Sequence, residues 1–577
     1  MKELLVYPEV QKIEIKGKPY RFNKTPRIRY QSREYTYNKI IRTWCKFNRY
    51  QLLESNGDVE LILNQTNDEN ITYIEENNSL TNEKYTIEVS FVNREPLVNI
   101  RFSHKRGLMY ALFTLQQMIN ADKLYNCYLE DYPKFNIRGI IEGYYGPPWK
   151  DEDRKAIFSL LLQYKMNTYF YGPKDDPYHR KLWRVLYPTE SLSKLKKLFN
   201  RAQVLEIDFF YSIGPGLSIR YSDKRDFELL LEKIKQIHSI GIKNFGFFLD
   251  DIPPILQHGV DKKVYEDLVS AHIDIISRLF SYLKTMDSEI RLVVCPTQYY
   301  GKGNEYYISK LGRNLDPLID IFWTGPEICS RELNLYDASV FRTSTYHKPL
   351  YWDNYPVNDL EMSEEMHIGP YLNRDMHLYR CSRGIISNGM QYAEASKIPF
   401  ITIACYLWNP EKYKPQNCWE HAIKSIVGEE DSEDFLVFAD NVRYSAIYPS
   451  NSPKLENIIT NLIFEYYYGN RERGFYEFDR AISQYLKASE KLLKGIKNGK
   501  LAKELEPWLN KFSKGIELFV KTVDCLKDYD KNKIDNLKEL YKNYQADKTK
   551  VFADVLYPFV ESVLEGDFHI KDQENYL

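Results

Sequence analysis

The first part of the chain alternates apolar and polar residues over short stretches. Three of these stretches, VELILNQ, YTIEVS and LVNIRFS, are rich in the residue types that favour β-strands. Residues 105–119 then place leucines and isoleucines three or four positions apart, which is the period of an amphipathic helix. The pattern predicts a small α+β domain over residues 1–134.

From residue 135 the pattern changes, and short apolar stretches alternate with amphipathic helical ones. Clear helical periods cover residues 151–165, 223–241 and 265–284. The predicted strands, eight in all, end near residues 143, 172, 214, 251, 296, 325, 354 and 388. Eight strand–helix units predict an α/β fold with a (β/α)8 TIM barrel over residues 135–412, an open doubly wound sheet being the alternative.

After residue 413 the strand patterns end. Amphipathic helical periods appear at residues 454–469, 481–497 and 514–529, with Lys and Glu on their outer faces. Charges in this pattern are typical of a solvated helix surface. The sequence therefore predicts a C-terminal α-helical domain, built as a bundle, over residues 413–577.

Charge and composition narrow the class of partner. The chain has 79 Lys and Arg against 80 Asp and Glu, a net charge of −1, and 43% hydrophobic residues. A nucleic-acid-binding protein usually carries an excess of basic residues, so we expect no nucleic-acid partner. No apolar run approaches the roughly 18 residues of a membrane span. The first residues lack the pattern of a signal peptide, so we expect a cytoplasmic location, or secretion if a signal was removed.

The eight cysteines are dispersed, without a CxxC pair or a Cys/His cluster at zinc spacing. We therefore predict reduced, mostly buried thiols, no metal site and no cofactor.

The predicted strand ends carry a distinct set of residues. In a (β/α)8 barrel the active site forms at the C-terminal ends of the strands. Here those ends are rich in Gly, Pro, Asp and Asn. Turns favour these residue types, so turn formation alone explains part of the enrichment. Aromatic residues beside Asp, Asn and Lys are less easily explained by turns; they are Tyr144, Tyr145, Tyr299 and Trp352. Rings for stacking and polar groups for hydroxyls indicate a small, uncharged polar ligand such as a carbohydrate.

Two adjacent carboxylates, Asp250 and Asp251, end the apolar strand FGFFLDD. Their mutual repulsion and apolar surroundings predict one raised pKa, giving one protonated and one ionised carboxyl, as glycoside cleavage requires. Two alternatives stay open from spacing alone. The pair is also compatible with a helix N-cap, and with a metal site shared with Asp175 and Asp176.

Each of the other polar residues at the strand ends is compatible with a role in the site and with a structural role. Lys174 either anchors a substrate hydroxyl or forms a salt bridge with Asp175 or Asp176. Cys295 lacks the His partner that a thiol nucleophile needs, so we interpret it as a wall residue. The remaining candidates either bind ring hydroxyls or shape turns; they are Asn354, Asp359 and Asn388.

Seven segments stand in order at seven of the eight predicted strand ends, from about residue 136 to about residue 413: RGIIEGYYGPPW, MNTYFYGPKDDPYHR, FLDDI, CPTQY, WTGP, WDNYPVND and SNGMQYAEASKI. Together these segments resemble a known family, the family 84 glycoside hydrolases, which are O-GlcNAcases and other β-N-acetylglucosaminidases. A small domain before the barrel and helices after it also fit the family in kind.

The resemblance implies substrate-assisted catalysis, in which the 2-acetamido carbonyl of the substrate attacks the anomeric carbon and forms an oxazoline. By motif, Asp250 would polarise the acetamido N–H, Asp251 would be the general acid and then the base, and Tyr299 would steady the oxazoline. Gly143 and Lys174 would bind sugar hydroxyls. The resemblance assigns the other hydroxyl contacts to Asn354, Asp359 and Asn388. It assigns the wall of the acetamido pocket to Cys295, Thr324 and Trp352.

The sequence thus predicts a retaining exo-β-N-acetylglucosaminidase that removes terminal β-linked GlcNAc, with a GlcNAc-bearing glycoprotein or glycoconjugate as partner. O-GlcNAc on protein Ser or Thr is the expected substrate. One alternative is a non-catalytic GlcNAc-binding barrel. Another is an endo-acting hyaluronidase or chitinase-like enzyme, although FGFFLDDIPP lacks the DxxDxDxE strand end of chitinases.

Overall fold

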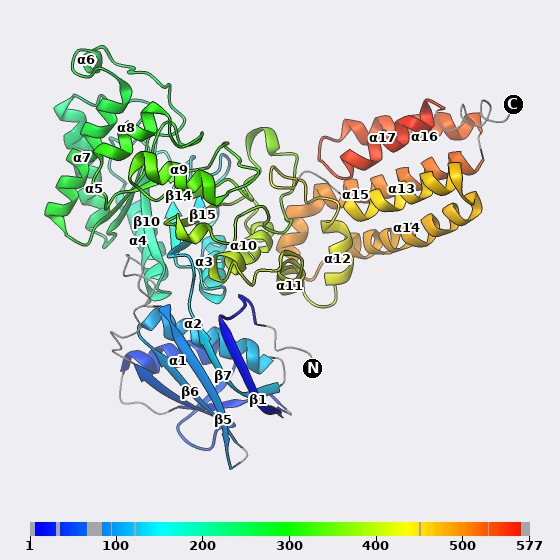
Figure 1. The fold of residues 1–577 in the computed structure, drawn as a ribbon, viewed down its shortest axis with the longest axis horizontal. Coiled ribbons are helices and arrows are strands. Elements are labelled where there is room, and N and C mark those ends of the chain that lie inside the picture. Colours follow the sequence, from blue (N-terminus) through cyan, green and yellow to red (C-terminus); the bar gives the residue numbers. More distant parts are fainter. Residues whose placement is uncertain are drawn as a thin grey trace.

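The structure, a computed structural model, describes residues 6–22, 24–30, 35–65, 83–93, 95–120, 123–448, 452–528 and 530–566. The chain forms an N-terminal α+β sheet, a central barrel and a C-terminal group of helices that extends away from the barrel (Figure 1). This arrangement confirms the predicted fold class.

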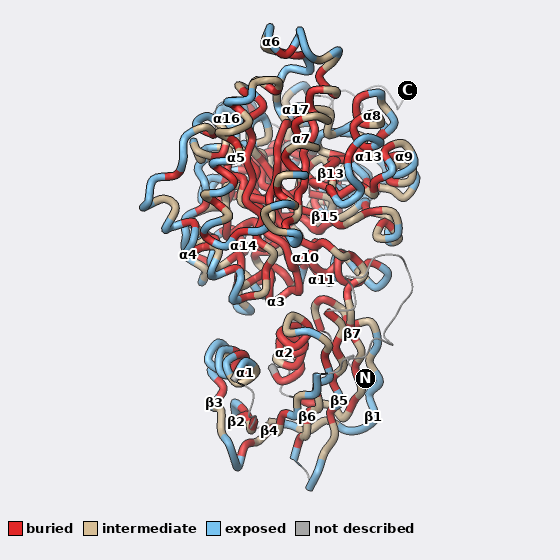
Figure 2. The backbone as a smooth tube through the Cα atoms, turned by 90° about the vertical axis from the view of Figure 1, so that its left-hand side faces the viewer, coloured by how far each residue is buried: buried red, intermediate tan, exposed pale blue. Residues whose placement is uncertain are grey.

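The N-terminal part is a mixed seven-stranded sheet with the order β1-β7-β5-β6-β4-β2-β3. Its strands are β1 (Lys12–Arg21), β2 (Arg27–Arg29), β3 (Gln51–Leu53), β4 (Val59–Gln65), β5 (Tyr85–Val92), β6 (Glu95–Phe102) and β7 (Lys123–Asp131). Helix α2 (Lys105–Asn120) packs on β5, β6 and β7, and α1 (Tyr35–Asn48) contacts β3 and α2 (Figure 2). The alternating pattern of β6, buried at every second residue over most of its length, buries one face of the sheet under α2.

The central part is a closed barrel of eight parallel strands in the order β10-β11-β12-β13-β14-β15-β8-β9, so the alternative of an open sheet is wrong. The strands are β8 (Ile137–Glu142), β9 (Thr168–Tyr171), β10 (Asp208–Ile213), β11 (Asn244–Phe248), β12 (Arg291–Cys295), β13 (Asp320–Trp323), β14 (Leu350–Asp353) and β15 (Gly384–Asn388). All eight coincide with predicted apolar stretches. Their parallel register brings all C-terminal ends to one rim.

A separate hydrophobic cluster fills the interior of the barrel. Phe170 and Phe210 stack with their ring centroids 4.2 Å apart, and Phe322 lies 5.1 Å from Phe170. Toward the C-terminal rim the cluster ends on Trp352 and Cys295. The packed interior therefore forms the floor on which the residues of the rim stand.

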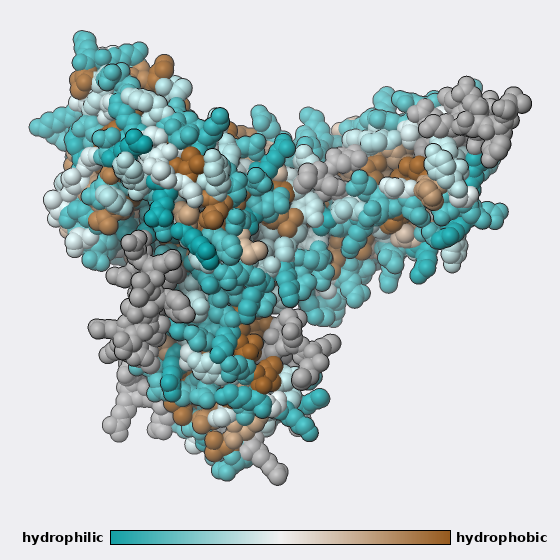
Figure 3. Space-filling view, in the orientation of Figure 1, coloured by the Kyte–Doolittle hydropathy of each residue, from teal (hydrophilic) through white to brown (hydrophobic). Residues whose placement is uncertain are grey.

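Helices surround the barrel and continue beyond it. Those around the barrel are α3 (Asp151–Gln163), α4 (Thr189–Val204), α5 (Lys224–His238), α6 (Gly259–Lys262), α7 (Leu268–Met286), α8 (Tyr306–Asn314), α9 (Leu335–Thr345) and α10 (Ala393–Trp408). Those that follow are α11 (Pro415–Val427), α12 (Ser432–Ala439), α13 (Pro453–Tyr468), α14 (Arg471–Lys494), α15 (Gly499–Lys527), α16 (Lys531–Ala546) and α17 (Ala553–Leu564). The visible surface is largely hydrophilic, with apolar side chains in small groups (Figure 3).

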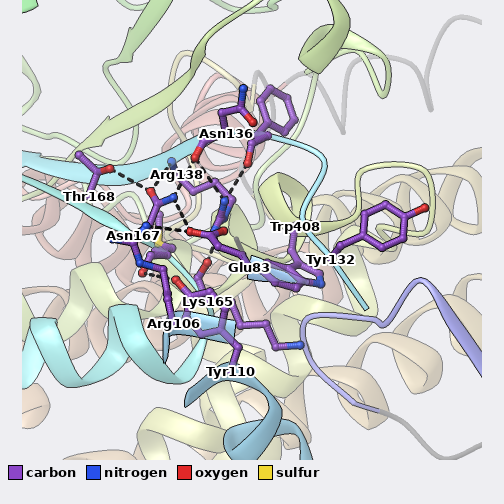
Figure 4. A network of polar contacts seen from close by, with 12 residues as sticks. Glu83, Arg106, Tyr110, Tyr132, Asn136, Arg138, Lys165, Asn167, Thr168 and Trp408 are labelled. Atoms are coloured by element: carbon purple, nitrogen blue, oxygen red, sulfur yellow. Dashed lines mark hydrogen bonds and ion pairs between the residues drawn. The ribbon is translucent and has the colours of Figure 1, made fainter. Parts of the chain in front are cut away.

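A buried polar network joins the N-terminal sheet to the barrel (Figure 4). The Glu83 carboxylate lies 2.5 Å from Arg138 at the start of β8 and 2.9 Å from Arg106 of α2. Asn167, just before β9, also donates to Glu83. Glu83 and Arg138 are almost fully buried, so the two parts of the chain share one interior at this point.

Over the described ranges, no helix combines the length and apolar character needed to cross a membrane.

Candidate active site

A cavity of about 470 Å³ opens at the C-terminal ends of the barrel strands, a volume in the usual range for a small-molecule site. Every residue to which the family resemblance assigns a role lines it: Gly143, Lys174, Asp250, Asp251, Cys295, Tyr299, Thr324, Trp352, Asn354, Asp359 and Asn388. They come from the ends of different strands, which explains why residues so far apart in the chain meet here. What each residue does stays a prediction.

The two adjacent carboxylates face a common cation. Lys174 Nζ lies 2.5 Å from Asp250 Oδ2 and 3.6 Å from Asp251 Oδ2, so Lys174 pairs with these residues and not with Asp175 or Asp176. Asp251 has a φ of 52°, in the left-handed region that non-glycine residues seldom adopt. Such local strain is typical of functional sites, where the surrounding structure holds the residue in place.

The structure contradicts the helix-cap alternative for the aspartate pair. The next helix, α6, begins only at Gly259, with His258 at its N-cap. The metal alternative has no support in the geometry either. Asp176 accepts hydrogen bonds from the hydroxyls of Tyr171 and Tyr187, and the described residues include no group of three or more His, Cys, Asp or Glu placed to hold a metal ion.

Two tyrosines donate to Asp251, one to each carboxylate oxygen. Tyr145 Oη lies 2.6 Å from Oδ2, and Tyr299 Oη lies 3.0 Å from Oδ1. Partial burial raises the pKa of Asp251, but Lys174, these two hydrogen bonds and Arg180 outweigh it and hold this pKa below its ordinary value. The expectation of a raised pKa is therefore wrong for Asp251, because two cations and two hydrogen-bond donors outweigh the effect of burial.

Lys174 and Asp359 carry the opposite kind of shift. Burial lowers the pKa of Lys174, but Asp250 and Asp251 outweigh burial, so the pKa is raised and the ammonium stays charged. Burial raises the pKa of Asp359, although the backbone N–H of Tyr145 donates to its Oδ2 at 2.6 Å. The pocket thus holds a fixed cation beside three carboxyl groups.

A chain of amides fixes one wall of the cavity. The Gly143 N–H donates to Asn388 Oδ1 at 3.2 Å, and Asn388 Nδ2 donates to Asn354 Oδ1 at 3.1 Å. Trp352 Nε1 donates to the same Asn354 oxygen at 2.9 Å, while Asn354 Nδ2 donates to the Ile328 carbonyl at 2.8 Å. Each amide therefore has a defined orientation, and the Trp352 ring is held against the cavity.

The apolar part of the wall rests on the barrel interior. The Trp352 ring packs on Phe248 and Phe322, with centroid distances of 5.5 and 5.4 Å. Cys295 is buried beside Asp250; its burial first, and this carboxylate next, raise the pKa of its thiol well above the ordinary value. A thiol in that state is a poor nucleophile, which supports the interpretation of Cys295 as a wall residue.

Tyr144 is the one aromatic candidate that the structure places elsewhere. Its side chain is buried, its hydroxyl donates to the Pro147 carbonyl at 3.1 Å, and its ring packs near Trp149. Tyr145, its neighbour, lines the cavity instead. Successive side chains point to opposite sides as the chain leaves a strand, so only one of the pair can reach the pocket.

Several lining residues were not predicted from the sequence: Phe322, Ile328, Cys329, Val357, Leu360, Glu361 and Met362. Most lie in the loops after β13 and β14. Apolar residues inside a loop show no periodic pattern, so periodicity does not identify them. For those after β14, the position in a loop directly after the WDN strand end is the one signal in the sequence that points to the site.

Comparisons with known proteins agree with this geometry. A family model described as beta-N-acetylglucosaminidase matches residues 138–440. The Protein O-GlcNAcases of Rattus norvegicus and Mus musculus are each 31% identical over 305 residues, which is 52% of this chain and 32% of theirs. The chain thus spans about a third of the length of these curated relatives.

Solved structures show the same likeness over more of the chain. A mutant of the Thermobaculum terrenum O-GlcNAc hydrolase is 31% identical with a TM-score of 0.72, covering 76% of this chain and 97% of that one. The structure named CpGH84B is 26% identical with a TM-score of 0.83, covering 97% of this chain and 100% of that one. The structure named CpGH84D, at 20% identity, a TM-score of 0.81 and coverage of 98% and 100%, shares the fold.

A closed (β/α)8 barrel whose strand ends bring together carboxylates, amides and aromatic walls is the architecture of a glycoside hydrolase. The family model matches more than half of the chain. The chain belongs to the beta-N-acetylglucosaminidase family, family 84 of the glycoside hydrolases.

Proposed function

We propose that this protein is a retaining exo-β-N-acetylglucosaminidase that hydrolyses terminal β-linked GlcNAc, with O-GlcNAc on protein Ser or Thr as its substrate. One observation carries the proposal. Asp250 and Asp251 lie side by side at the rim, with Lys174 bridging them and Tyr299 on Asp251, in the cavity of about 470 Å³. Family membership supports GlcNAc as that sugar.

The proposed reaction begins with the substrate's own acetamido group. Its carbonyl oxygen attacks the anomeric carbon while the bond to the leaving oxygen breaks, and Asp251 gives its proton to that oxygen. The Asp250 carboxylate accepts a hydrogen bond from the acetamido N–H, and its negative charge stabilises the positive charge that develops on the oxazoline ring. Water then attacks the anomeric carbon on the face opposite the oxazoline oxygen, and Asp251 takes a proton from this water. The bond between the anomeric carbon and the oxazoline oxygen breaks, which restores the acetamido group and releases β-GlcNAc.

The acid step requires a protonated Asp251, whereas Lys174, Arg180 and the two tyrosines favour its ionised form. We propose that the bound sugar changes this balance in two ways. It excludes water from the pocket, and its hydroxyls compete for Lys174, which sits 3.6 Å from Asp251. Both changes favour the uncharged carboxyl, which can then act as the acid.

An Asp251→Asn variant tests the assignment. We expect its kcat/KM on a β-GlcNAc substrate with a poor leaving group to fall about 10²–10⁴-fold, the usual contribution of a general acid. A substrate whose leaving group needs no proton should lose much less in the first step. Asp175→Asn, in an exposed residue of the same rim, is the matched control. Unchanged kinetics in Asp251→Asn would refute the assignment.

The substrate class needs a separate assay. Purified protein is incubated with an O-GlcNAc-modified peptide, with chitobiose and with hyaluronan. We expect release of GlcNAc from the peptide to be the fastest reaction. Internal cleavage of hyaluronan would favour the endo-acting alternative, and binding of GlcNAc without turnover would favour the non-catalytic barrel. A cytoplasmic location stays a prediction.

A further inference from the structure

Arg180 lies beside the candidate active site without lining the cavity. It follows β9 in the same loop as Lys174. Its Nη1 donates to Tyr145 Oη at 2.9 Å, its Nη2 donates to the main-chain oxygen of Asp251 at 3.4 Å, and its guanidinium lies 5.8 Å from the centre of the Tyr145 ring. Arg180 therefore touches both Tyr145 and the backbone of Asp251.

The contact with Arg180 decides where the Tyr145 proton goes. A guanidinium only donates hydrogen bonds, so the Tyr145 oxygen must accept from Arg180. The single hydroxyl proton of Tyr145 is then left for Asp251 Oδ2, which lies 2.6 Å away. Tyr299 occupies the other carboxylate oxygen. With both oxygens engaged, the Asp251 carboxylate has one defined rotation.

We infer that Arg180 is a positioning residue, which acts through Tyr145 to orient the carboxyl group of Asp251 for proton transfer. The inference rests on the proposed function, in which Asp251 is the general acid and base. Arg180 is not among the residues that the family motifs assign to the site. Its contribution is indirect, because it touches Tyr145 and not the sugar pocket.

The charges around Asp251 predict the effect of removing Arg180. The titratable and charged groups that face Asp251 are Asp250, Lys174, Arg180, Tyr145, Tyr299, Cys295 and Asp359. Loss of the guanidinium removes one of two cations and frees the Tyr145 hydroxyl to rotate. Both changes disfavour the ionised carboxylate, so the pKa of Asp251 rises. Because the first step needs protonated Asp251, the alkaline limb of the kcat/KM profile moves to higher pH.

The experiment measures kcat and KM against pH for the full chain on an aryl β-GlcNAc substrate. The variants are Arg180→Met, Tyr145→Phe and the double variant. Lys181→Met is the matched control, since Lys181 is an exposed cation in the adjacent position. We expect Arg180→Met to shift the alkaline limb up by about half to one pH unit. We also expect it to lower kcat and leave KM within about twofold, because the cavity wall is intact.

The double variant separates action through Tyr145 from an independent effect. If Arg180 acts mainly through Tyr145, adding Arg180→Met to Tyr145→Phe shifts the limb by less than Arg180→Met does alone, because only the direct charge of the guanidinium is left to remove. Additive effects, or a fall in kcat without a shifted limb, would overturn the inference. If Arg180→Met does not fold, Arg180→Lys keeps the cation without the planar fork and should give a smaller shift in the same direction. An inactive wild type would instead refute the proposed function.

Discussion

At the scale of single residues, the site depends on contacts too close to tolerate added atoms. A Cβ at Gly143 would lie 2.6 Å from Trp352 Cζ2, and Trp352 is held by its bond to Asn354. Gly143 therefore lets the strand end approach the indole closely, and the position of that ring sets the width of the pocket.

Gly143→Ala should push the Trp352 ring into the pocket. We expect kcat/KM to fall about tenfold or more, because overpacking of a tight contact costs about 1–3 kcal/mol. The loss should appear mainly in KM, since the aspartates keep their positions. Gly259→Ala, where the added Cβ meets nothing within 4 Å, is the control. Equal kinetics for both variants would show that the pocket adjusts freely.

The sequence predicts which residues form the site better than it predicts their protonation states. Strand ends in the sequence placed Asp250, Asp251 and Tyr299 in one pocket, because a barrel brings all its strand ends together. The direction of the Asp251 pKa could not be predicted, because it depends on Lys174 and Tyr145, which reach it from other loops. Arg180 was not predicted either, because its contacts with Tyr145 and Asp251 also join different loops.

At the scale of helices and strands, α10 links the site to the C-terminal helices. It follows β15, whose last residue, Asn388, lines the cavity. Glu504 of α15 accepts hydrogen bonds from the backbone N–H groups of Glu394 and Ala395 at the start of α10, at 3.1 and 2.8 Å. A side chain from another part of the fold thus caps this helix.

Glu504 should make stability depend on pH. Burial first, and Glu394 among the nearby charges, raise its pKa from 4.5 to about 7, although the two backbone donors act in the other direction. The folded state therefore holds this proton more tightly than the unfolded state, and the contribution to stability present below about pH 4.5 is lost as pH rises through about 7. We expect the wild type to lose thermal stability relative to Glu504→Gln between pH 5 and pH 8.

Thermal unfolding of both proteins at the two pH values measures this difference. Glu506→Gln, in an exposed residue of the same helix, should show none. A gap between wild type and Glu504→Gln that is the same at pH 5 and pH 8 would contradict the role of Glu504.

The sequence predicted the barrel strands closely because each is a short apolar run between turn residues. It did not single out α10, which is buried along its entire length from Ala393 to Trp408 and so has no polar face to reveal a helical period. Helices α14 and α15 begin earlier than predicted. The first half of α15 already carries the apolar period of Leu501, Leu505 and Leu509, but it contains Pro507, a residue type that usually marks a helix boundary.

At the scale of the whole molecule, buried charges connect the N-terminal sheet to the barrel and its helices. Lys165, after α3, lies 2.8 Å from Asp131 of β7, and Trp408 Nε1 donates to the same carboxylate at 2.8 Å. Together with the Glu83–Arg138 pair, this forms an interface in which removing one partner would leave an uncompensated buried charge. Such networks join residues far apart in the sequence, so composition and periodicity give no sign of them. The boundaries at residues 134 and 412 stay predictions.

The measurement that tests the central claim most directly uses aryl β-GlcNAc substrates whose acetyl group carries none, one, two or three fluorines. Fluorine withdraws electrons from the acetamido carbonyl and weakens it as the nucleophile, while the leaving group stays the same. If the substrate's own acetamido group attacks the anomeric carbon, kcat should fall steeply with each fluorine. A kcat that does not change across the series would contradict the account, because the nucleophile would then have to come from the protein or from water.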